Sequence, residues 1–315
     1  MTSTTGLLRC LAVLIPAGAS DTYETPLDIP RTNSVCRGDS EEQVSDSSLN
    51  VRGVFDSELP GIERKYQLKL ILHPHIGDLT RYDHLRTAVG LRYSMSNRLE
   101  LSAETNTYFG TGLRGAAFFE DYGLLDARFG FKYRLGERLL RDWDSSAGVN
   151  YQFPFGSPPP RLTDGFKHLR PFVTFARPVE TVPGLRVFWK AGLDLLAPTM
   201  VEGRHDRNDL TDDSANISGG FVWEFENFHY TFEAAYETTR FIGTRHDDVF
   251  LVRPGLIWKI PRRFTPVSRG QWLFGLALKL SEGPDGFDVG LSGKLRVNLD
   301  LKRLLRRQRA SAVQP

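Results

Sequence analysis

The stretch FVWEFENFHYTFEAAYE, residues 221–237, carries a large ring at nearly every second position and changes phase once. The rings before the change are Phe221, Trp223 and Phe225, and those after it are Phe228, Tyr230 and Phe232. Successive side chains of a β-strand point to opposite faces, so each half of the stretch predicts a strand. The change of phase at Glu226-Asn227 is what a two-residue hairpin turn requires to keep all the rings on one face.

This hairpin would have one apolar face and one charged face. Phe225 would lie opposite Phe228, Trp223 opposite Tyr230, and Phe221 opposite Phe232. The other face would collect polar and charged side chains, namely Glu224, His229, Thr231, Glu233 and Glu237. Such a ribbon belongs in a sheet that meets an apolar medium on one side and water or other charges on the other.

The same alternation recurs from Glu63 to near the end of the chain, in about twelve segments of roughly 10–13 residues. Strands of soluble proteins average about 5–6 residues, whereas a tilted strand that crosses a membrane needs about 9–11. Shorter and longer connections alternate between the segments. The sequence therefore predicts an all-β fold, a transmembrane antiparallel up-and-down β-barrel of about 12 strands.

Composition excludes several other classes of protein. The chain of 315 residues is 40% hydrophobic and 25% charged, and beyond its first residues it has no apolar run of the about 20 residues that a membrane helix needs. Its net charge is +2, from 40 basic and 38 acidic residues, which is too balanced to predict a nucleic-acid partner. The two cysteines, Cys10 and Cys36, do not have the spacing of a metal site.

Four regions are expected along the chain. Residues 1–20 have the charged, apolar and small-residue parts of a secretory signal peptide. Residues 21–62 are polar and acidic, and we interpret most of them as a disordered arm, with a plug inside the barrel as the alternative. The barrel would occupy residues 63–301. Residues 302–315 form a basic tail that is either solvated or in contact with anionic lipid or periplasmic polyanions.

Aromatic side chains gather near the predicted short turns, as expected for the headgroup level of a bilayer. The predicted girdle consists of Tyr93, Tyr133, Trp143, Trp223, Phe225, Phe228, Tyr230, Trp258 and Trp272. The polar faces of the strands supply the predicted lumen. Its candidate lining residues are Arg86, Arg92, Glu100, Glu104, Arg128, Lys132, Glu224, Glu233 and Glu237. Either opposite charges pair across strands and partly plug a narrow lumen, or a basic ladder attracts anionic solutes.

No set of residues predicts an enzyme. His73 and His75 lie two apart on one face and, with His84, could share a metal, but a place at the barrel rim explains them more simply. The sequence lacks a Gly-x-Ser-x-Gly elbow, a phosphate loop and a dinucleotide fingerprint. We expect no catalytic residues, no metal and no cofactor.

Three short motifs resemble those of a known family. Arg92-Tyr93 is followed by a short turn and Arg98-Leu99-Glu100-Leu101, and Lys132-Tyr133-Arg134 comes on a later segment. In these motifs, over roughly residues 85–178, the chain resembles the bacterial outer-membrane β-barrel transporters of the phenol-degradation meta-pathway type. The resemblance implies passage of small organic molecules across the outer membrane. Where such barrels often finish on an aromatic residue, this chain has Val297-Asn298-Leu299-Asp300-Leu301 and then the basic tail.

The sequence favours an outer-membrane, porin-like channel for the passive passage of small organic or weakly anionic solutes, with both termini in the periplasm. Its expected partners are outer-membrane lipid, the small-molecule solute and the barrel-assembly machinery. The alternative is a non-conducting structural or surface-binding barrel of the outer membrane. A lipid-acting enzyme at the rim would need a nucleophile and a base that we do not find, and a soluble secreted β protein would not gather rings at strand ends.

Overall fold

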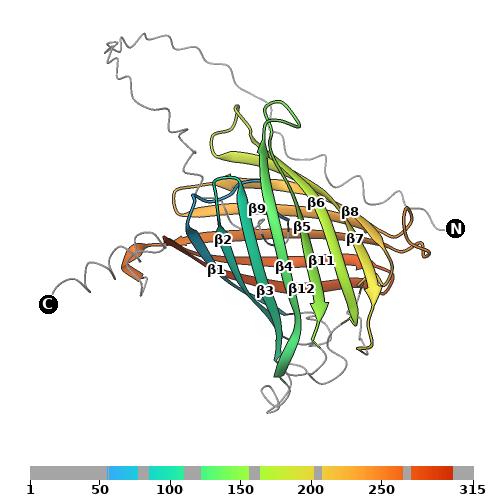
Figure 1. Ribbon diagram of the computed structural model, residues 1–315. Coiled ribbons are helices and arrows are strands. Elements are labelled where there is room, and N and C mark those ends of the chain that lie inside the picture. Colours follow the sequence, from blue (N-terminus) through green and yellow to red (C-terminus); the bar gives the residue numbers. More distant parts are fainter. Residues whose placement is uncertain are drawn as a thin grey trace, which may run out of the picture. The chain divides into compact units, whose positions relative to one another are not determined.

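The computed structural model describes Phe55 and residues 57–76, 85–109, 122–155, 164–201, 208–264 and 271–300. Twelve antiparallel strands form a closed barrel in which each strand pairs with its neighbours in sequence and β1 pairs with β12 (Figure 1). The strands are β1 (Gln67–Ile76), β2 (Leu85–Ser94), β3 (Leu99–Phe109), β4 (Tyr122–Gly136), β5 (Asp144–Pro154), β6 (Phe166–Pro178), β7 (Leu185–Pro198), β8 (Ser214–Glu224), β9 (Phe228–Thr238), β10 (Asp248–Ile260), β11 (Gln271–Gly283) and β12 (Gly286–Asp300). The all-β, twelve-stranded up-and-down barrel expected from the sequence is confirmed.

The hairpin of β8 and β9 has the predicted register. Phe221 lies opposite Phe232 and Trp223 opposite Tyr230, and the Phe221 and Phe232 rings stack with their centroids 5.9 Å apart. The Phe225 amide donates a hydrogen bond of 2.8 Å to the Phe228 carbonyl, which closes the turn. A slip of one residue would turn every ring to the other face, so the two-faced pattern allows a single register.

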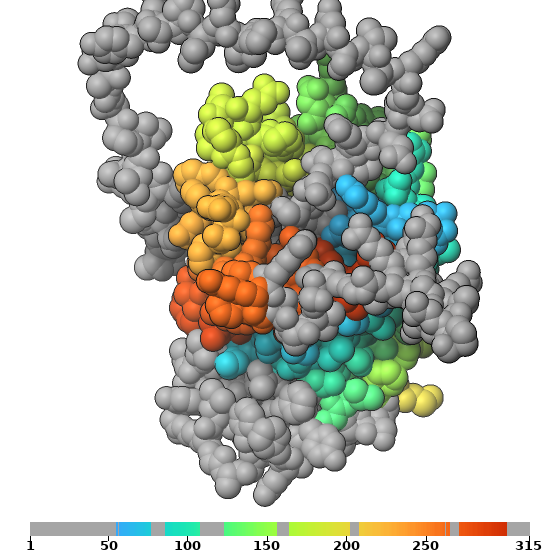
Figure 2. Space-filling model, turned by 90° about the vertical axis from the view of Figure 1, so that its left-hand side faces the viewer, coloured from blue at the N-terminus to red at the C-terminus, as the bar shows by residue number. Residues whose placement is uncertain are grey.

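Closure of the sheet removes its edges. The first strand and the last are paired from Gln67↔Asp300 to Ile76↔Leu291, and the space-filling view shows blue and orange-red residues on the same face of the molecule (Figure 2). Each strand therefore has a partner on both sides, and its backbone groups bond within the sheet. This arrangement is what a strand needs where water cannot reach its amides.

The two faces of the barrel are inverted relative to a soluble protein. Apolar side chains such as Phe131 and Leu276, each 48% exposed, cover the outer face of the strands. Charged side chains such as Lys69 and Arg296, each 1% exposed, point inward and are buried. A soluble protein would bury the first kind and expose the second. A barrel with an apolar outside fits a bilayer as its surroundings.

The connections divide between the two ends of the barrel. Connections 95–98, 137–143, 179–184, 225–227 and 261–270 share one end with the start of β1 and the end of β12, and the first four of them are short turns. Connections 77–84, 110–121, 155–165, 199–213, 239–247 and 284–285 lie at the other end. The strands begin at Gln67 and end at Asp300. The expected signal peptide, most of the arm and the basic tail lie outside the described residues.

Among the described residues, no helix is both long and apolar enough to cross a membrane.

Candidate functional site in the barrel interior

The barrel encloses a cavity of about 490 Å³ to which all twelve strands contribute lining residues. Five of the nine residues predicted to line the lumen border it, namely Arg86, Glu104, Arg128, Glu233 and Glu237. His73 and His75 also face this cavity, and His75 Nδ1 lies 3.0 Å from Ser292 Oγ. In the part of the chain that the structure describes, no group of three or more His, Cys, Asp or Glu is placed to hold a metal ion.

Three more of the predicted lining residues lie deeper, in a buried cluster of charges. Glu100 of β3 is the anion at its centre. Its carboxylate lies 2.9 Å from Lys69 Nζ, 3.0 Å from Arg92 Nη1 and 3.5 Å from Lys132 Nζ. These residues come from β1, β2, β3 and β4, so the cluster spans four adjacent strands. The ninth candidate, Glu224, ends β8 and is half-buried, and it does not line the cavity.

A stretch of chain before β1 lies within the barrel. We call the described residues Phe55 and 57–63 the inner segment. Its backbone is held by side chains of the wall: Lys132 Nζ donates to the Leu59 and Gly61 carbonyls, at 3.0 Å each, and Lys294 Nζ donates to the Phe55 carbonyl at 3.1 Å. The Glu233 carboxylate accepts hydrogen bonds from the Phe55 and Ser57 amides.

The inner segment also pairs its own acids with the wall. Glu58 lies 3.5 Å from Arg92, and Glu63 contacts Arg296 and lies 3.6 Å from Lys69. Two anions of the segment therefore join the cationic cluster around Glu100. Ordered backbone that carries buried polar groups must find partners for them, and here the wall provides these partners.

Apolar side chains of the inner segment pack on another part of the wall. Phe55 is 2% exposed. A Cβ placed on Gly255 or Gly275 would lie 2.5 Å or 3.1 Å from its ring, so these two glycines of β10 and β11 make the room that the ring occupies. Phe55 and Leu59 form one buried cluster with inward side chains of the strands, namely Ala176, Phe188, Val222, Ile257, Leu273 and Ala277.

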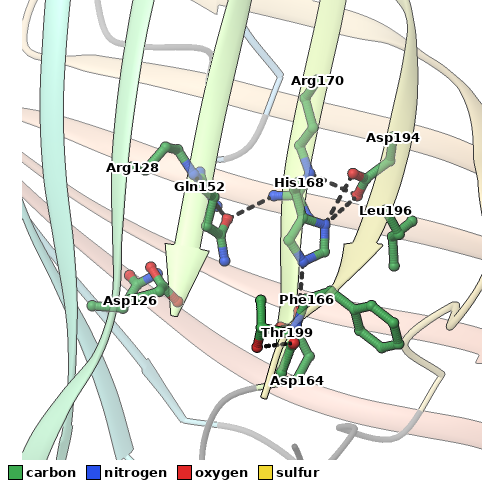
Figure 3. A network of polar contacts seen from close by, with 12 residues as sticks. Asp126, Arg128, Gln152, Asp164, Phe166, His168, Arg170, Asp194, Leu196 and Thr199 are labelled. Carbon is green, nitrogen blue, oxygen red and sulfur yellow. Dashed lines mark hydrogen bonds and ion pairs between the residues drawn. The ribbon is translucent and has the colours of Figure 1, made fainter. Parts of the chain in front are cut away.

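A chain of polar contacts crosses strands β4 to β7 near connections 155–165 and 199–213, at the end of the barrel opposite the short turns (Figure 3). Gln152 Oε1 accepts from Arg128 at 2.8 Å and from Arg170 at 3.0 Å, and Arg170 Nε donates to Asp194 at 2.7 Å. His168 completes the chain, with Nδ1 2.9 Å from Asp194 and Nε2 2.7 Å from Asp164. These contacts fix the direction of Arg128 and Arg170 at the cavity wall.

Two acids outside the strands have perturbed pKa values. Burial raises the pKa of Asp164, but the hydrogen bond from His168 and the charges of His168 and Arg170 lower it further, so that it falls below its usual value. Asp212 accepts hydrogen bonds from the Thr244 hydroxyl and from the Arg245 and Thr244 amides, which lowers its pKa to about 2. Asp212 therefore ties the connection between β7 and β8 to the connection between β9 and β10.

The predicted girdle residues lie at one end of the barrel. Each is within a turn or in the first or last four residues of a strand at the end with the short turns. Five have strongly exposed rings, namely Tyr133, Trp223, Phe225, Phe228 and Tyr230. Trp143 also packs its ring under Arg177, 4.8 Å from ring centroid to guanidinium carbon. Their position at the headgroup level of a membrane stays a prediction.

A plug inside the barrel was the alternative interpretation of residues 21–62, but the sequence did not single out the residues that form the inner segment. Residues 55–63, FDSELPGIE, have no strand period, and their partners are distant in sequence, such as Glu233 for Phe55. The one available signal was the change from polar, acidic sequence to apolar residues at Phe55, Leu59 and Ile62, all of which are buried.

The fold is similar to those of bacterial outer-membrane channels. No family model matches the chain, and no curated protein matches it. An outer-membrane channel of Pseudomonas putida F1 is 10% identical, with a TM-score of 0.52, and the match covers 76% of this chain and 97% of that one. The KdgM porin (9% identical, TM-score 0.42, 73% and 97% covered) and the NanC porin (11%, 0.43, 72% and 98%) also match. At this identity the likeness shows the fold, a porin-like barrel; the narrower phenol-degradation family stays a prediction.

Proposed function

We propose that the protein is a channel of the bacterial outer membrane for the passive passage of small organic or weakly anionic solutes. The observation that carries the proposal is the cavity bordered by all twelve strands, inside a barrel whose outer face is apolar. Charged walls around a cavity attract solutes of opposite sign. The porin-like fold supports the proposal, and no step of chemistry is asked of any residue.

The charges of the wall favour anions. Around the inner segment the described wall carries more cations than anions. The cations are Lys69, Arg92, Lys132, Arg253, Lys294 and Arg296, and the anions are Glu100 and Glu233. Glu58 and Glu63 of the inner segment pair with two of these cations and so offset part of the positive charge. A solute that takes the place of the segment would therefore meet a site that favours negative charge.

The topology supports a periplasmic position for both termini. The start of β1 and the end of β12 share the end of the barrel with the short turns. In outer-membrane barrels of this kind the short turns face the periplasm and the longer loops face outward. Insertion in this orientation would require the barrel-assembly machinery as a partner.

A second candidate function is a barrel that does not conduct. The specific observation in its favour is the inner segment, which fills the interior beside the cationic cluster and bonds to the wall through Lys132, Lys294 and Glu233. If the segment stays in place, function would rest on the outer connections, as a structural or surface-binding protein.

Single-channel recording in planar bilayers separates the two. We expect the refolded full-length protein to show conductance steps, more frequent in the Phe55→Ala variant because its segment loses a buried ring. With a salt gradient the reversal potential should favour anions, and Arg128→Glu, at the cavity wall, should shift it toward cations. Glu282→Gln, at an exposed position of β11, is the matched control for a change of charge. Heat-modifiable gel migration shows whether each protein has refolded. If neither the refolded parent nor refolded Phe55→Ala gave any conductance, the non-conducting barrel would be favoured.

A further inference from the structure

The interior next to the inner segment is divided into an apolar part and a cationic part. The apolar part comes from inward positions on β6, β7, β8, β10 and β11, where a barrel lumen ordinarily carries polar side chains. The cationic part comes from β1, β2, β4 and β12. A lumen built only for water and ions has no need of buried apolar side chains on one side.

The inner segment matches this division group by group. Its ring at Phe55 and its side chain at Leu59 lie in the apolar part. Its carboxylates at Glu58 and Glu63 lie in the cationic part, against Arg92 and Arg296. The segment thus presents an apolar body and carboxylates to a wall that is shaped for both, as a bound ligand would.

Removal of the segment would leave the site unsatisfied in two ways. Of the ion pairs described above, Lys69, Arg92 and Lys132 would keep only those with Glu100. Arg296 would lose its ion pair with Glu63. Buried cations without counter-charges are strongly unfavourable. The space beside Gly255 and Gly275, now occupied by the Phe55 ring, would open an apolar surface to water.

We propose that this interior site binds small amphipathic carboxylates, in which an apolar or aromatic body carries one carboxylate, and that the inner segment is the internal ligand which such solutes displace. The inference deepens the proposed function, because it names the class of solute that the channel would admit. A carboxylate matches the guanidinium of Arg92 or Arg296 through paired hydrogen bonds. A short hydrophilic anion would leave the apolar part unfilled, and a neutral analogue would leave the cations without a counter-charge.

A reversible lock on the segment provides the test in the full chain. Ser57 Oγ lies 3.1 Å from Ser218 Oγ on β8, so cysteines at both positions are close enough to form a disulfide, whose sulfurs stand about 2.0 Å apart. Cys10 and Cys36 are replaced by Ser so that no other thiol competes. Oxidation holds the segment in the site, and reduction frees it in the same protein molecules.

Binding is measured by isothermal titration calorimetry in detergent micelles with 3-phenylpropionate, its neutral amide and acetate as probes. We expect binding of 3-phenylpropionate to the reduced protein and at least tenfold weaker binding to the oxidised protein. The amide and acetate should each bind at least tenfold more weakly than the carboxylate. Partition of the probe into micelles is equal in both redox states and cancels.

A substitution gives a second, independent readout. Phe55→Ala in the parent chain should tighten 3-phenylpropionate binding several-fold, because a weakened segment competes less for the site. Phe241→Ala is the matched control, since Phe241 is exposed in the connection between β9 and β10. Equal affinities in the locked, reduced and Phe55→Ala proteins, or equal binding of the amide and the carboxylate, would overturn the inference.

Conductance separates this inference from the proposed function. Conductance that the oxidised lock abolishes, with no binding preference among the three probes, would keep the channel and overturn the amphipathic-carboxylate site. Lock-sensitive binding of 3-phenylpropionate in a protein that never conducts would keep the site and overturn the channel.

Discussion

Replacement of Glu100 by Gln should destabilise the barrel more than any other single change of one carboxylate to an amide on its inner wall. Glu100 is buried and serves Lys69, Arg92 and Lys132, at 2.9, 3.0 and 3.5 Å. Glutamine has nearly the same shape and can still accept a hydrogen bond, so packing is preserved and the charge alone is lost. Breaking a buried ion pair by removal of one partner costs about 3–5 kcal/mol. We therefore expect a loss of about 3 kcal/mol in the free energy of unfolding, the lower end of that range.

Urea titration of the protein in detergent micelles measures this loss. Tryptophan fluorescence reports unfolding, and heat-modifiable gel migration shows that the variant has refolded. For a protein whose free energy of unfolding falls by about 2–3 kcal/mol per molar urea, the midpoint should drop by roughly 1–1.5 M. The slope of the transition should stay unchanged, since the surface exposed on unfolding is the same.

Glu282→Gln is the control for this experiment. Glu282 is on β11 and exposed, and its neutralisation should change stability by no more than about 0.5 kcal/mol. If Glu100→Gln and Glu282→Gln had the same midpoint, within error, Glu100 would not be the counter-charge of the three cations. The account of the interior as a charge cluster that needs its anion would then be refuted.

Three further predictions concern the outer face, the inner segment and the outer connections. Leu276→Arg puts a charge on the apolar face near the middle of β11. In a bilayer it should lower the free energy of unfolding by about 2–4 kcal/mol, measured as a lower urea midpoint in lipid vesicles. An unchanged midpoint would argue against lipid at this position. Gly275→Val should push out the Phe55 ring and speed maleimide labelling of a cysteine at position 57 several-fold, whereas an unchanged rate would place the ring elsewhere. Asp212 has its folded pKa depressed to about 2, so its stabilisation is complete above the unfolded value of about 4 and is lost as pH falls toward 2. Asp212→Asn should therefore speed hydrogen exchange at the Thr244 amide at pH 7, and equal exchange in both proteins would contradict this.

The fold was predictable because its signal is local. In the β8–β9 hairpin, alternation gives the faces, and the single change of phase at Glu226-Asn227 gives the turn, so that the opposition of Trp223 and Tyr230 follows. The depth of a side chain inside the barrel was not predictable in this way. Arg92 and Arg86 share one face of β2, yet Arg86 borders the cavity and Arg92 lies in the buried cluster. Depth depends on how twelve strands are staggered around the barrel, which no single segment encodes.

The inner segment was less predictable still, because many of its contacts with the wall run through its backbone. Lys132 binds the Leu59 and Gly61 carbonyls, and any sequence presents such carbonyls, so the pairing leaves no mark in residue types. The signal that the sequence does carry is the change to apolar residues at Phe55, Leu59 and Ile62.

The cationic surplus of the wall gives the acids Glu58 and Glu63 a meaning that neither the segment nor the wall has alone. A wall selected only for stability would pair its cations within itself, as Arg170 and Asp194 do across β6 and β7. Around Glu100 the wall instead leaves part of its charge to be met by Glu58 and Glu63, on a chain segment that a reversible motion could withdraw. Because buried charges demand partners, the segment can leave only when another anion replaces it. The segment and the solute then compete for the same interior site. The cationic residues that hold the segment in this site would also select the solute that displaces it.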